Sequence, residues 1–413
     1  MTAMKGRGHS LLAASVIMLW VFYCNSVAAA APARLAISCG ALGVQLRLCQ
    51  EGVEAWSRQT GTPVKVVATP NSSTERFALY QQILASHSPD IDVFQIDVVW
   101  PGTFAPHLVD LSSYIDGRFT QQFFQTMITN NTIDGALVAM PWYTDAGVLF
   151  YRKDLLQKYG RSPPQTWQQL TESARIIQNA ERAAGNTRMQ GFVFQAKGYE
   201  GLTCDALEWI DSFNGGTLVN SAGKVTLDNA RAAAALDLAA SWIGDIAPKG
   251  VLNYDEEASR GVFQSGNAVF MRNWPYAWAL GNAEGSPIRG RIGVMALPRG
   301  GDQGHPSATL GGWQLAVSRY SRHPALAADL VRYLTSYAEQ KRRAIAASYN
   351  PTIKALYQDQ EVLAAVPLPI CPAAARWWMT VIMPIPRRLT LRCRCCRDNP
   401  VTAYWYWARC LSW

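Results

Sequence analysis

The chain has 413 residues, of which 49% are hydrophobic and 16% are charged, and its formal net charge is +8. This length suffices for two or more domains with full-sized cores. Two of the positive charges lie in residues 1–31 and six in residues 371–413, so residues 32–370 are neutral. Phosphate binding needs a concentrated cationic surface, so the neutral body argues against a nucleic-acid partner.

Residues 1–31 have the pattern of a signal peptide. Lys5 and Arg7 precede a mostly apolar segment of 13 residues, which is too short to favour a membrane span. The small residues that follow predict cleavage near Ala30 or Ala31. We therefore expect an exported protein, and an uncleaved membrane anchor is the alternative.

Export makes disulfide bonds possible. Cys39 and Cys49 are ten residues apart, at a strand end and in the helical segment that follows, so they are candidates for a short-loop disulfide. Cys204 is predicted to be a buried thiol.

The body begins with alternating strand and helix patterns. Residues 34–40, 63–69 and 91–97 are apolar and compatible with strands, and helical spacing of apolar residues separates them. This βαβαβ start predicts an α/β fold with a mainly parallel sheet. Ligands of such sheets bind beyond the carboxyl ends of the strands, where Asp97 and Trp100 lie.

The alternation continues to residue 347, with Asp228 predicted to cap one of the helices. Further strands are predicted at 147–152, 191–196, 268–272, 292–298 and 312–318. No internal repeat or low-complexity linker precedes residue 370. This continuity fits two lobes crossed by several chain segments.

Motifs for nucleotide, metal or cofactor binding are missing from the sequence. There is no P-loop, no G-x-G-x-x-G after a strand and no H-E-x-x-H, and the five histidines are scattered. The CRCC run at 393–396 lacks a second pair of metal ligands. We expect neither a metal nor a cofactor.

Aromatic rings occur close to carboxylates or glycines at several predicted strand ends. The rings and carboxylates are Asp97, Trp100, Trp142, Tyr143, Asp145, Trp274 and Trp313. Sugars need this combination, because their C–H faces pack on flat rings while their hydroxyls bind carboxylates and arginine. In an exported, neutral protein the pattern favours a carbohydrate ligand.

Three long segments carry a family resemblance: 141–170 (PWYTDAGVLFYRKDLLQKYGRSPPQTWQQL), 266–278 (GNAVFMRNWPYAW) and 307–318 (SATLGGWQLAVS). They resemble the trehalose/maltose-type members of the family 1 extracellular solute-binding proteins, which are periplasmic components of ABC sugar importers. The likeness runs in unbroken order from about Leu35 to Asp359. It implies a two-lobed periplasmic binding protein fold of type II, a bound α-linked disaccharide, permease subunits as partners, a monomer and no enzymatic activity.

The resemblance also marks seven residues as contacts of the sugar: Arg76, Asp97, Tyr143, Asp145, Trp274, Gly312 and Trp313. Trp274 and Trp313 correspond to stacking rings, and Gly312 to a backbone contact. Where relatives place a sugar-binding glutamate, this chain offers Gln45 or Glu51. Tyr276 and Trp278 are expected to pack behind Trp274.

The resemblance implies two lobes joined by three crossings. Lobe 1 is expected at 32–145 and 298–348, and lobe 2 at 146–297 and 349–370. The crossings are expected near Asp145–Val148, Ile292–Leu297 and Ser348–Pro351, where they would act as a hinge.

Residues 371–413 depart from the family pattern. They contain five Cys, five Trp and seven Arg but no Lys and no Glu, without helical or strand periodicity. We predict a shifted reading frame that begins between Leu363 and Cys371. The alternative is a genuine Cys-rich appendage.

Two other functions stay open at this point. A glycoside hydrolase would use paired carboxylates such as Asp97 and Asp145, although neither lies in a recognisable catalytic motif. The second open function is a receptor of the same fold whose ligand is another oligosaccharide, a polyol or a glycerophosphodiester. The sequence does not rank trehalose above maltose or sucrose.

Overall fold

The structure, a computed structural model, describes residues 33–41, 43–220 and 222–366. The expected signal peptide and the tail at 371–413 lie outside these residues. Within the described part, no helix has both the length and the apolar character that crossing a membrane requires. Two main β-sheets, each with helices on both faces, confirm the predicted α/β class.

The first sheet has five strands in the order β2-β1-β3-β11-β6. Their bounds are β1 Leu35–Ser38, β2 Val64–Val67, β3 Val93–Asp97, β6 Met140–Ala146 and β11 Leu310–Val317. β1 pairs in parallel with β2 and β3, whereas β11 is antiparallel to both β3 and β6. The sheet is therefore mixed but mainly parallel, as predicted, because β6 runs in the same direction as β1, β2 and β3, and β11 alone of these five strands runs against them. β11 is reversed because the chain returns from the second sheet and enters the first at the end where β6 leaves it.

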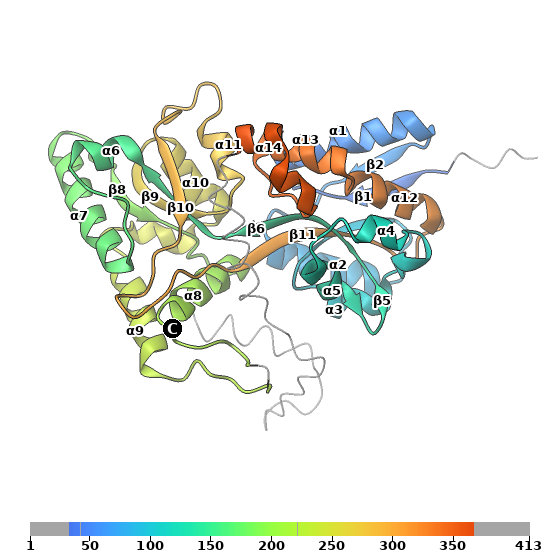
Figure 1. Cartoon of the computed structure of the whole chain (residues 1–413), viewed down its shortest axis with the longest axis horizontal. Helices are drawn as coiled ribbons and strands as arrows, with labels where there is room; N and C mark the ends of the chain where they lie inside the picture. The colour runs from blue at the N-terminus through green and yellow to red at the C-terminus, as the bar shows by residue number, and fades with distance from the viewer. Residues whose placement is uncertain (1–32, 42, 221, 367–413) are drawn as a thin grey trace, which may run out of the picture. The chain divides into compact units, whose positions relative to one another are not determined.

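Helices cover both faces of the first sheet (Figure 1). One face packs against α1 (Gly43–Thr60), α12 (Pro324–Leu334) and α13 (Tyr337–Ala347), and the other against α2 (Ser73–Ala85) and α3 (Pro101–Phe104). Val93 faces one core and Phe94 the other, as the period of two along a strand requires. The remaining elements of this part are η1 Ala105–His107, η2 Leu111–Ser113, α4 Gly117–Thr120, α5 Gln125–Asn130, β4 Thr132–Ile133 and β5 Ala136–Leu137.

The second sheet has four strands in the order β10-β7-β9-β8. Their bounds are β7 Val148–Arg152, β8 Gln190–Val193, β9 Ala268–Asn273 and β10 Ile292–Ala296. The helices of this part are α6 Lys153–Lys158, α7 Trp167–Ala183, α8 Glu200–Ser212, α9 Ala230–Ser241, η3 Lys249–Asn253, α10 Glu256–Gln264 and α11 Ala277–Gly281. Asn229, not the predicted Asp228, caps α9, because its side chain accepts the N–H groups of Arg231 and Ala232.

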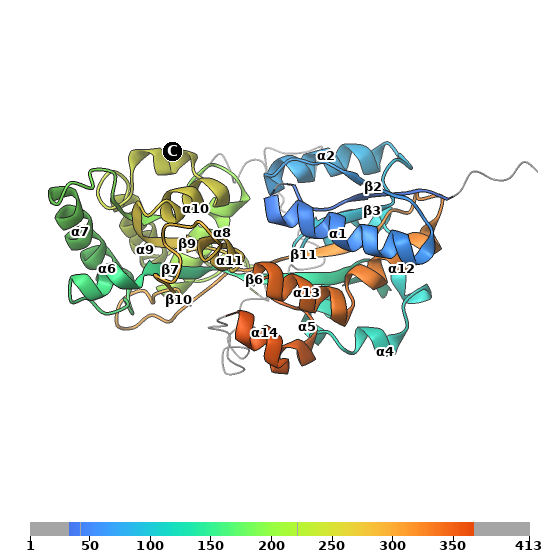
Figure 2. The same ribbon diagram turned by 90° about the horizontal axis from the view of Figure 1, so that it is seen from above.

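Two connections link the sheets in the described chain. Gly147 alone separates β6 from β7, and residues 297–309 separate β10 from β11. β6 and β11 lie side by side in both views (Figures 1 and 2) and are hydrogen-bonded neighbours. The chain therefore leaves the first sheet at the end of β6 and returns to it at the start of β11, the adjacent strand.

Residues 349–366 belong with the first sheet, so the expectations that they pack in lobe 2 and that the chain crosses near Ser348–Pro351 are wrong; residues 367–370 lie outside the described chain. This segment holds η4 (Lys354–Gln358) and α14 (Gln360–Ala365). Its apolar side chains Tyr349, Ile353, Leu356 and Val362 are buried in the same core as β1 and β6. Backbone bonds from Phe124 to Thr352 and from Lys354 to Gln122 hold it there. The family resemblance gave the two-lobed architecture but assigned this segment to the wrong one of the two cores.

Candidate functional site

Three predicted site residues lie side by side on adjacent strands of the first sheet. Trp313 on β11 is opposite Asp97 on β3 and opposite Tyr143 on β6. Asp97 is buried, and its Oδ1 accepts a hydrogen bond from Val99 N–H at 3.1 Å. Burial, reinforced by the nearby Glu200 carboxylate, raises the pKa of Asp97 well above its usual range.

Arg76 reaches this group from α2. Its guanidinium lies 4.6 Å from the centre of the Trp313 ring. Nε and Nη2 both donate to the carbonyl oxygen of Pro70, at 3.1 and 3.0 Å, while Nη1 is buried without a hydrogen-bond partner among the described residues. Arg76 is thus held in place with one donor left over.

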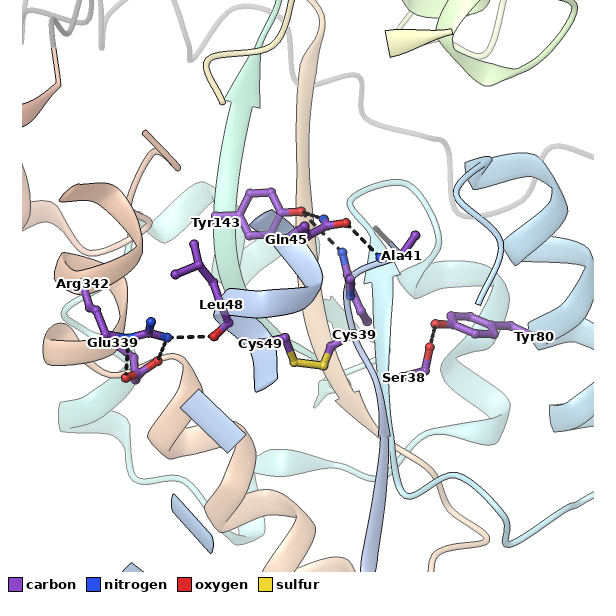
Figure 3. The surroundings of a disulfide bond; sticks show 12 residues. Ser38, Cys39, Ala41, Gln45, Leu48, Cys49, Tyr80, Tyr143, Glu339 and Arg342 are labelled. Carbon is purple, nitrogen blue, oxygen red and sulfur yellow. Dashed lines mark hydrogen bonds and ion pairs between the residues drawn. A yellow bond between two sulfur atoms is a disulfide. The ribbon is translucent and has the colours of Figure 1, made fainter. Parts of the chain in front are cut away.

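Tyr143 is fixed by glutamine side chains (Figure 3). Its hydroxyl accepts bonds from the amide nitrogens of Gln45, on α1, and of Gln95, on β3. Glu51 instead pairs with Arg47 and Arg342 on the far side of α1. Of the two candidates for the family glutamate, the structure thus brings only Gln45 to the site.

A disulfide joins Cys39 to Cys49, as the sequence suggested (Figure 3). It ties the segment after β1 to the middle of α1, and Gln45 lies inside the loop that it closes. Cys204 is a free, buried thiol, which confirms its prediction.

Asp145 is the most exceptional carboxyl group of the site. It lies on β6 opposite Gly311 of β11, and its Oδ1 is buried with no hydrogen-bond partner in the described chain. Burial raises its pKa to about 7, and the positive charges of Arg272 and Arg343 limit the rise. An acceptor without a donor suits a hydroxyl-bearing ligand, because an unmade bond at a buried oxygen costs free energy.

The backbone conformation and close packing at position 312 require a glycine. Its φ of 131° lies in a region that other residues avoid, and a Cβ atom there would stand 2.6 Å from the carbonyl oxygen of Tyr143. Its own carbonyl accepts the N–H of Val98. The close pairing of β6 and β11 at the site depends on this residue, while its contact with a ligand stays a prediction.

Trp274 enters from the second sheet, directly after β9. Its indole nitrogen donates to Glu256 Oε1 at 3.3 Å, and the Arg272 guanidinium lies 3.9 Å from its ring centre. Its ring edge approaches Gly311, where a Cβ atom would be 3.1 Å away. The ring is therefore next to Asp145, which faces the same glycine. The second sheet thus places the edge of an indole ring against β11, beside Asp145.

The neighbours of Trp274 pack in two directions. Tyr276 donates to Glu257 at 2.7 Å and packs against the core of the first sheet, whereas Trp278 packs against the core beneath α10 and α11. Both rings are partly buried, so neither is a free ligand surface.

Sequence reasoning missed two acidic residues of the site, Glu200 and Glu256. Glu200, at the start of α8, accepts the Ser73 hydroxyl and donates its own N–H to Thr74, so it joins α8 to α2. Burial raises the pKa of Glu256, which binds the Trp274 indole. Both residues occupy the first turn of a helix, where a glutamate is already explained by the helix dipole. No signal in one sequence separates that role from a ligand role.

The described residues contain no group of three or more His, Cys, Asp or Glu side chains that could hold a metal ion. The site therefore combines indole rings, buried carboxyl groups and one spare arginine donor. Such a set can hold a polyhydroxylated ligand through ring stacking and charge-assisted hydrogen bonds.

Comparison with known proteins adds three findings. The sequence pattern of the bacterial extracellular solute-binding proteins matches residues 48–341. A probable ABC transporter-binding protein of Deinococcus radiodurans is 54% identical over 334 residues, which cover 81% of this chain and 79% of the relative. The maltose-bound structure of MalE3 from T. maritima superposes with a TM-score of 0.79 at 41% identity, covering 86% of this chain and 90% of that one.

A more distant solved structure shows the same fold. A solute-binding protein from Agrobacterium radiobacter K84, in complex with ribitol, has a TM-score of 0.74 at 20% identity and covers 84% of this chain and 88% of its own. These neighbours confirm the predicted two-lobed architecture.

Proposed function

Because the chain belongs to the family of bacterial extracellular solute-binding proteins, we propose that it captures an α-linked disaccharide of the trehalose or maltose type and delivers it to the permease subunits of an ABC importer. It would act in the periplasm, as a monomer, after its signal peptide is removed. The observation that carries the proposal is the meeting of Trp274, from the second sheet, with Asp145 at Gly311 of the first.

The aromatic rings and the polar side chains of this site contribute different interactions to binding. Trp274 and Trp313 offer flat apolar surfaces for the C–H faces of sugar rings. Asp97, Asp145 and Arg76 offer buried polar atoms that hydroxyl groups can pair with. A ligand with both apolar faces and several hydroxyls satisfies both sets at once, as a disaccharide does. MalE3, the 41% identical neighbour, holds maltose.

Calorimetry with trehalose, maltose, sucrose, mannitol and ribitol tests the ligand class. We expect at least one disaccharide to bind more tightly than either polyol. Tight binding of a polyol with no response to any disaccharide would contradict the proposal and support a polyol receptor.

A hydrolase remains the second candidate, because Asp97 and Asp145 both have pKa values raised by burial, as the general acid of a glycosidase does. Prolonged incubation with trehalose and maltose separates the two functions. A receptor leaves both sugars intact, whereas steady release of glucose would establish catalysis.

Trp274→Ala tests the stacking role. Loss of the ring should weaken disaccharide binding by roughly 1–3 kcal/mol, or about tenfold to a hundredfold in Kd. Trp278→Ala is the matched control, because that ring packs into the second sheet's core and should change stability more than affinity. Equal affinities for the wild type and Trp274→Ala would make Trp274 a packing residue only.

Asp145→Asn tests the charge. It keeps the shape of the side chain but removes the carboxylate, so Kd should rise about tenfold or more. Asp237→Asn, at an exposed position of α9, is the control and should leave Kd unchanged. An unaltered Kd for Asp145→Asn would remove this residue from the site.

A sugar that touches residues of both sheets binds best when the lobes are closed, so it shifts the population toward closure; hinge closure is a known property of periplasmic binding proteins. Small-angle scattering should therefore show a smaller radius of gyration with saturating sugar. An unchanged radius at saturation would argue against a hinge.

A further inference from the structure

Behind Trp274 lies a buried ionic cluster that the proposed ligand contacts do not include. Arg272, on β9, is 2.9 Å from Asp205 Oδ1 and 2.5 Å from Glu208 Oε1, both on α8, and all three side chains are at most 1% exposed. Its third nitrogen donates to Gln195 Oε1 at 3.0 Å. We call Arg272, Asp205 and Glu208 the ionic cluster. A planar guanidinium held along two of its edges cannot turn, so its plane is fixed relative to α8.

The ionic cluster contacts both connections between the sheets. Glu208 Oε1 also accepts the backbone N–H of Thr309, the last residue before β11, at 3.1 Å. At the other connection, a Cβ atom built on Gly147 would lie 2.0 Å from the same oxygen. One carboxylate oxygen thus abuts the chain where it leaves β6 and where it enters β11.

The ionic cluster also holds Trp274. The Arg272 guanidinium lies 3.9 Å from the centre of the indole ring and covers one of its faces. A ligand can therefore stack only on the other face. Because Arg272 is fixed by Glu208, and Glu208 abuts both connections, the orientation of the ring and the positions of the connections share one rigid support.

We propose that Arg272, Asp205 and Glu208 are positioning residues that orient Trp274 and couple its orientation to the two connections between the lobes. The part of the inference that concerns a ligand rests on the proposed function. The part that concerns the ring does not, because all of its contacts lie within the described chain. In this arrangement a sugar that stacks on Trp274 and changes its orientation also displaces Arg272 and Glu208. Glu208 contacts the two connections about which the lobes move, so these connections respond to the ligand.

The first test needs no ligand. Protein labelled with 5-fluorotryptophan gives fluorine NMR signals, and those of Trp274 and Trp313 are assigned with Trp274→Phe and Trp313→Phe. Glu208→Gln places an amide N–H against Arg272 Nε, so the Trp274 signal should shift or broaden while the Trp313 signal stays in place. An unmoved Trp274 signal in a folded Glu208→Gln protein would overturn the proposal.

Gly147→Ala is an independent variant, because it displaces Glu208 from the side of the connection without altering a charge. It should move the same Trp274 signal. Gly261→Ala, where a Cβ atom meets nothing within 4 Å, is the matched control and should move neither signal. If Gly147→Ala also leaves the Trp274 signal unmoved, the connection and the ring are independent and the coupling is refuted.

The second test measures coupling to the ligand with maltose as the probe. Glu208→Gln should raise Kd by about tenfold in the wild-type background but by less than about threefold in Trp274→Ala, because the ring it orients is gone. In Trp313→Ala the effect should stay at about tenfold. Equal effects in all three backgrounds would contradict coupling through Trp274. Absence of maltose binding in the wild type would count against the proposed ligand, and the NMR result would still decide the positioning of the ring.

Discussion

Arg272 and Arg343 are both 1% exposed, and each lies on a tryptophan ring, Arg272 at 3.9 Å from Trp274 and Arg343 at 3.8 Å from Trp142. Their other surroundings differ. Arg272 has two carboxylates, whereas no guanidinium nitrogen of Arg343 has a hydrogen-bond partner in the described residues. The rings of Tyr143 and Tyr349 lie around Arg343 instead.

The difference shows two ways of burying the same cation. Burial lowers the pKa of Arg343, and nearby tyrosines offset this only in part. For Arg272 burial acts in the same direction, but Asp205 and Glu208 outweigh it and raise the pKa above its usual value. Removing Arg272 would therefore leave buried carboxylates without a counter-charge. Arg343 is instead surrounded by aromatic rings, which lose no hydrogen-bond partner when it is removed.

The largest effect is expected for Arg272→Met. Removing the cation leaves Asp205 and Glu208 buried without a counter-charge, so the free energy of unfolding should fall by about 3–5 kcal/mol. Urea denaturation followed by circular dichroism measures it. A loss below about 1 kcal/mol would mean that the two ion pairs contribute little to stability.

Arg343→Met should cost less, at most about 2 kcal/mol, because the change removes a cation–π contact and also three buried donors that lack partners. The same urea titration serves as the measurement. A loss as large as that of Arg272→Met would show that Arg343 has a partner of opposite charge, and the comparison between the two arginines would fail.

Asp145 lies in the field of both arginines, and its pKa of about 7 predicts a pH-dependent affinity. Its ionised fraction rises from about one tenth at pH 6 to about nine tenths at pH 8, so sugar affinity should rise by up to about tenfold over this range. Asp145→Asn should remove the dependence. Calorimetry at both pH values tests it, and a flat profile in the wild type would exclude Asp145 as a charged acceptor.

The same raised pKa affects stability with the opposite sign. Between about pH 4 and pH 7 the folded protein keeps a proton on Asp145 that the unfolded chain releases, so this group lowers stability as pH rises through that window.

The smallest effect is expected on the midpoint of the pH dependence of sugar affinity. Arg343 lowers the pKa of Asp145, so Arg343→Met should move the midpoint to higher pH without changing the affinity at the alkaline plateau. A midpoint that stays in place would mean that Arg272 alone sets the field at Asp145.

The location of the candidate site residues could be predicted best where they lie at strand ends. Asp97 ends β3, Asp145 is one residue before the end of β6 and Trp274 follows β9, so strand patterns placed them at strand ends, while the family resemblance suggested their contact with a ligand. The direction of β11 could not be predicted, because apolar alternation is the same in parallel and antiparallel strands. The partners of Arg272 could not be predicted either. Asp205 and Glu208 fit the polar positions of a helix, and only the packing of α8 on β9 buries them.

The disulfide between Cys39 and Cys49 has a consequence for when the protein becomes competent to bind. It closes a loop that holds Gln45 against Tyr143, and such bonds form in oxidising compartments, not in the reducing cytoplasm. A precursor still inside the cell would hold that side of the site without its covalent tether. The covalent tether of Gln45 is then tied to export, because the bond that provides it forms only after the chain has left the cytoplasm.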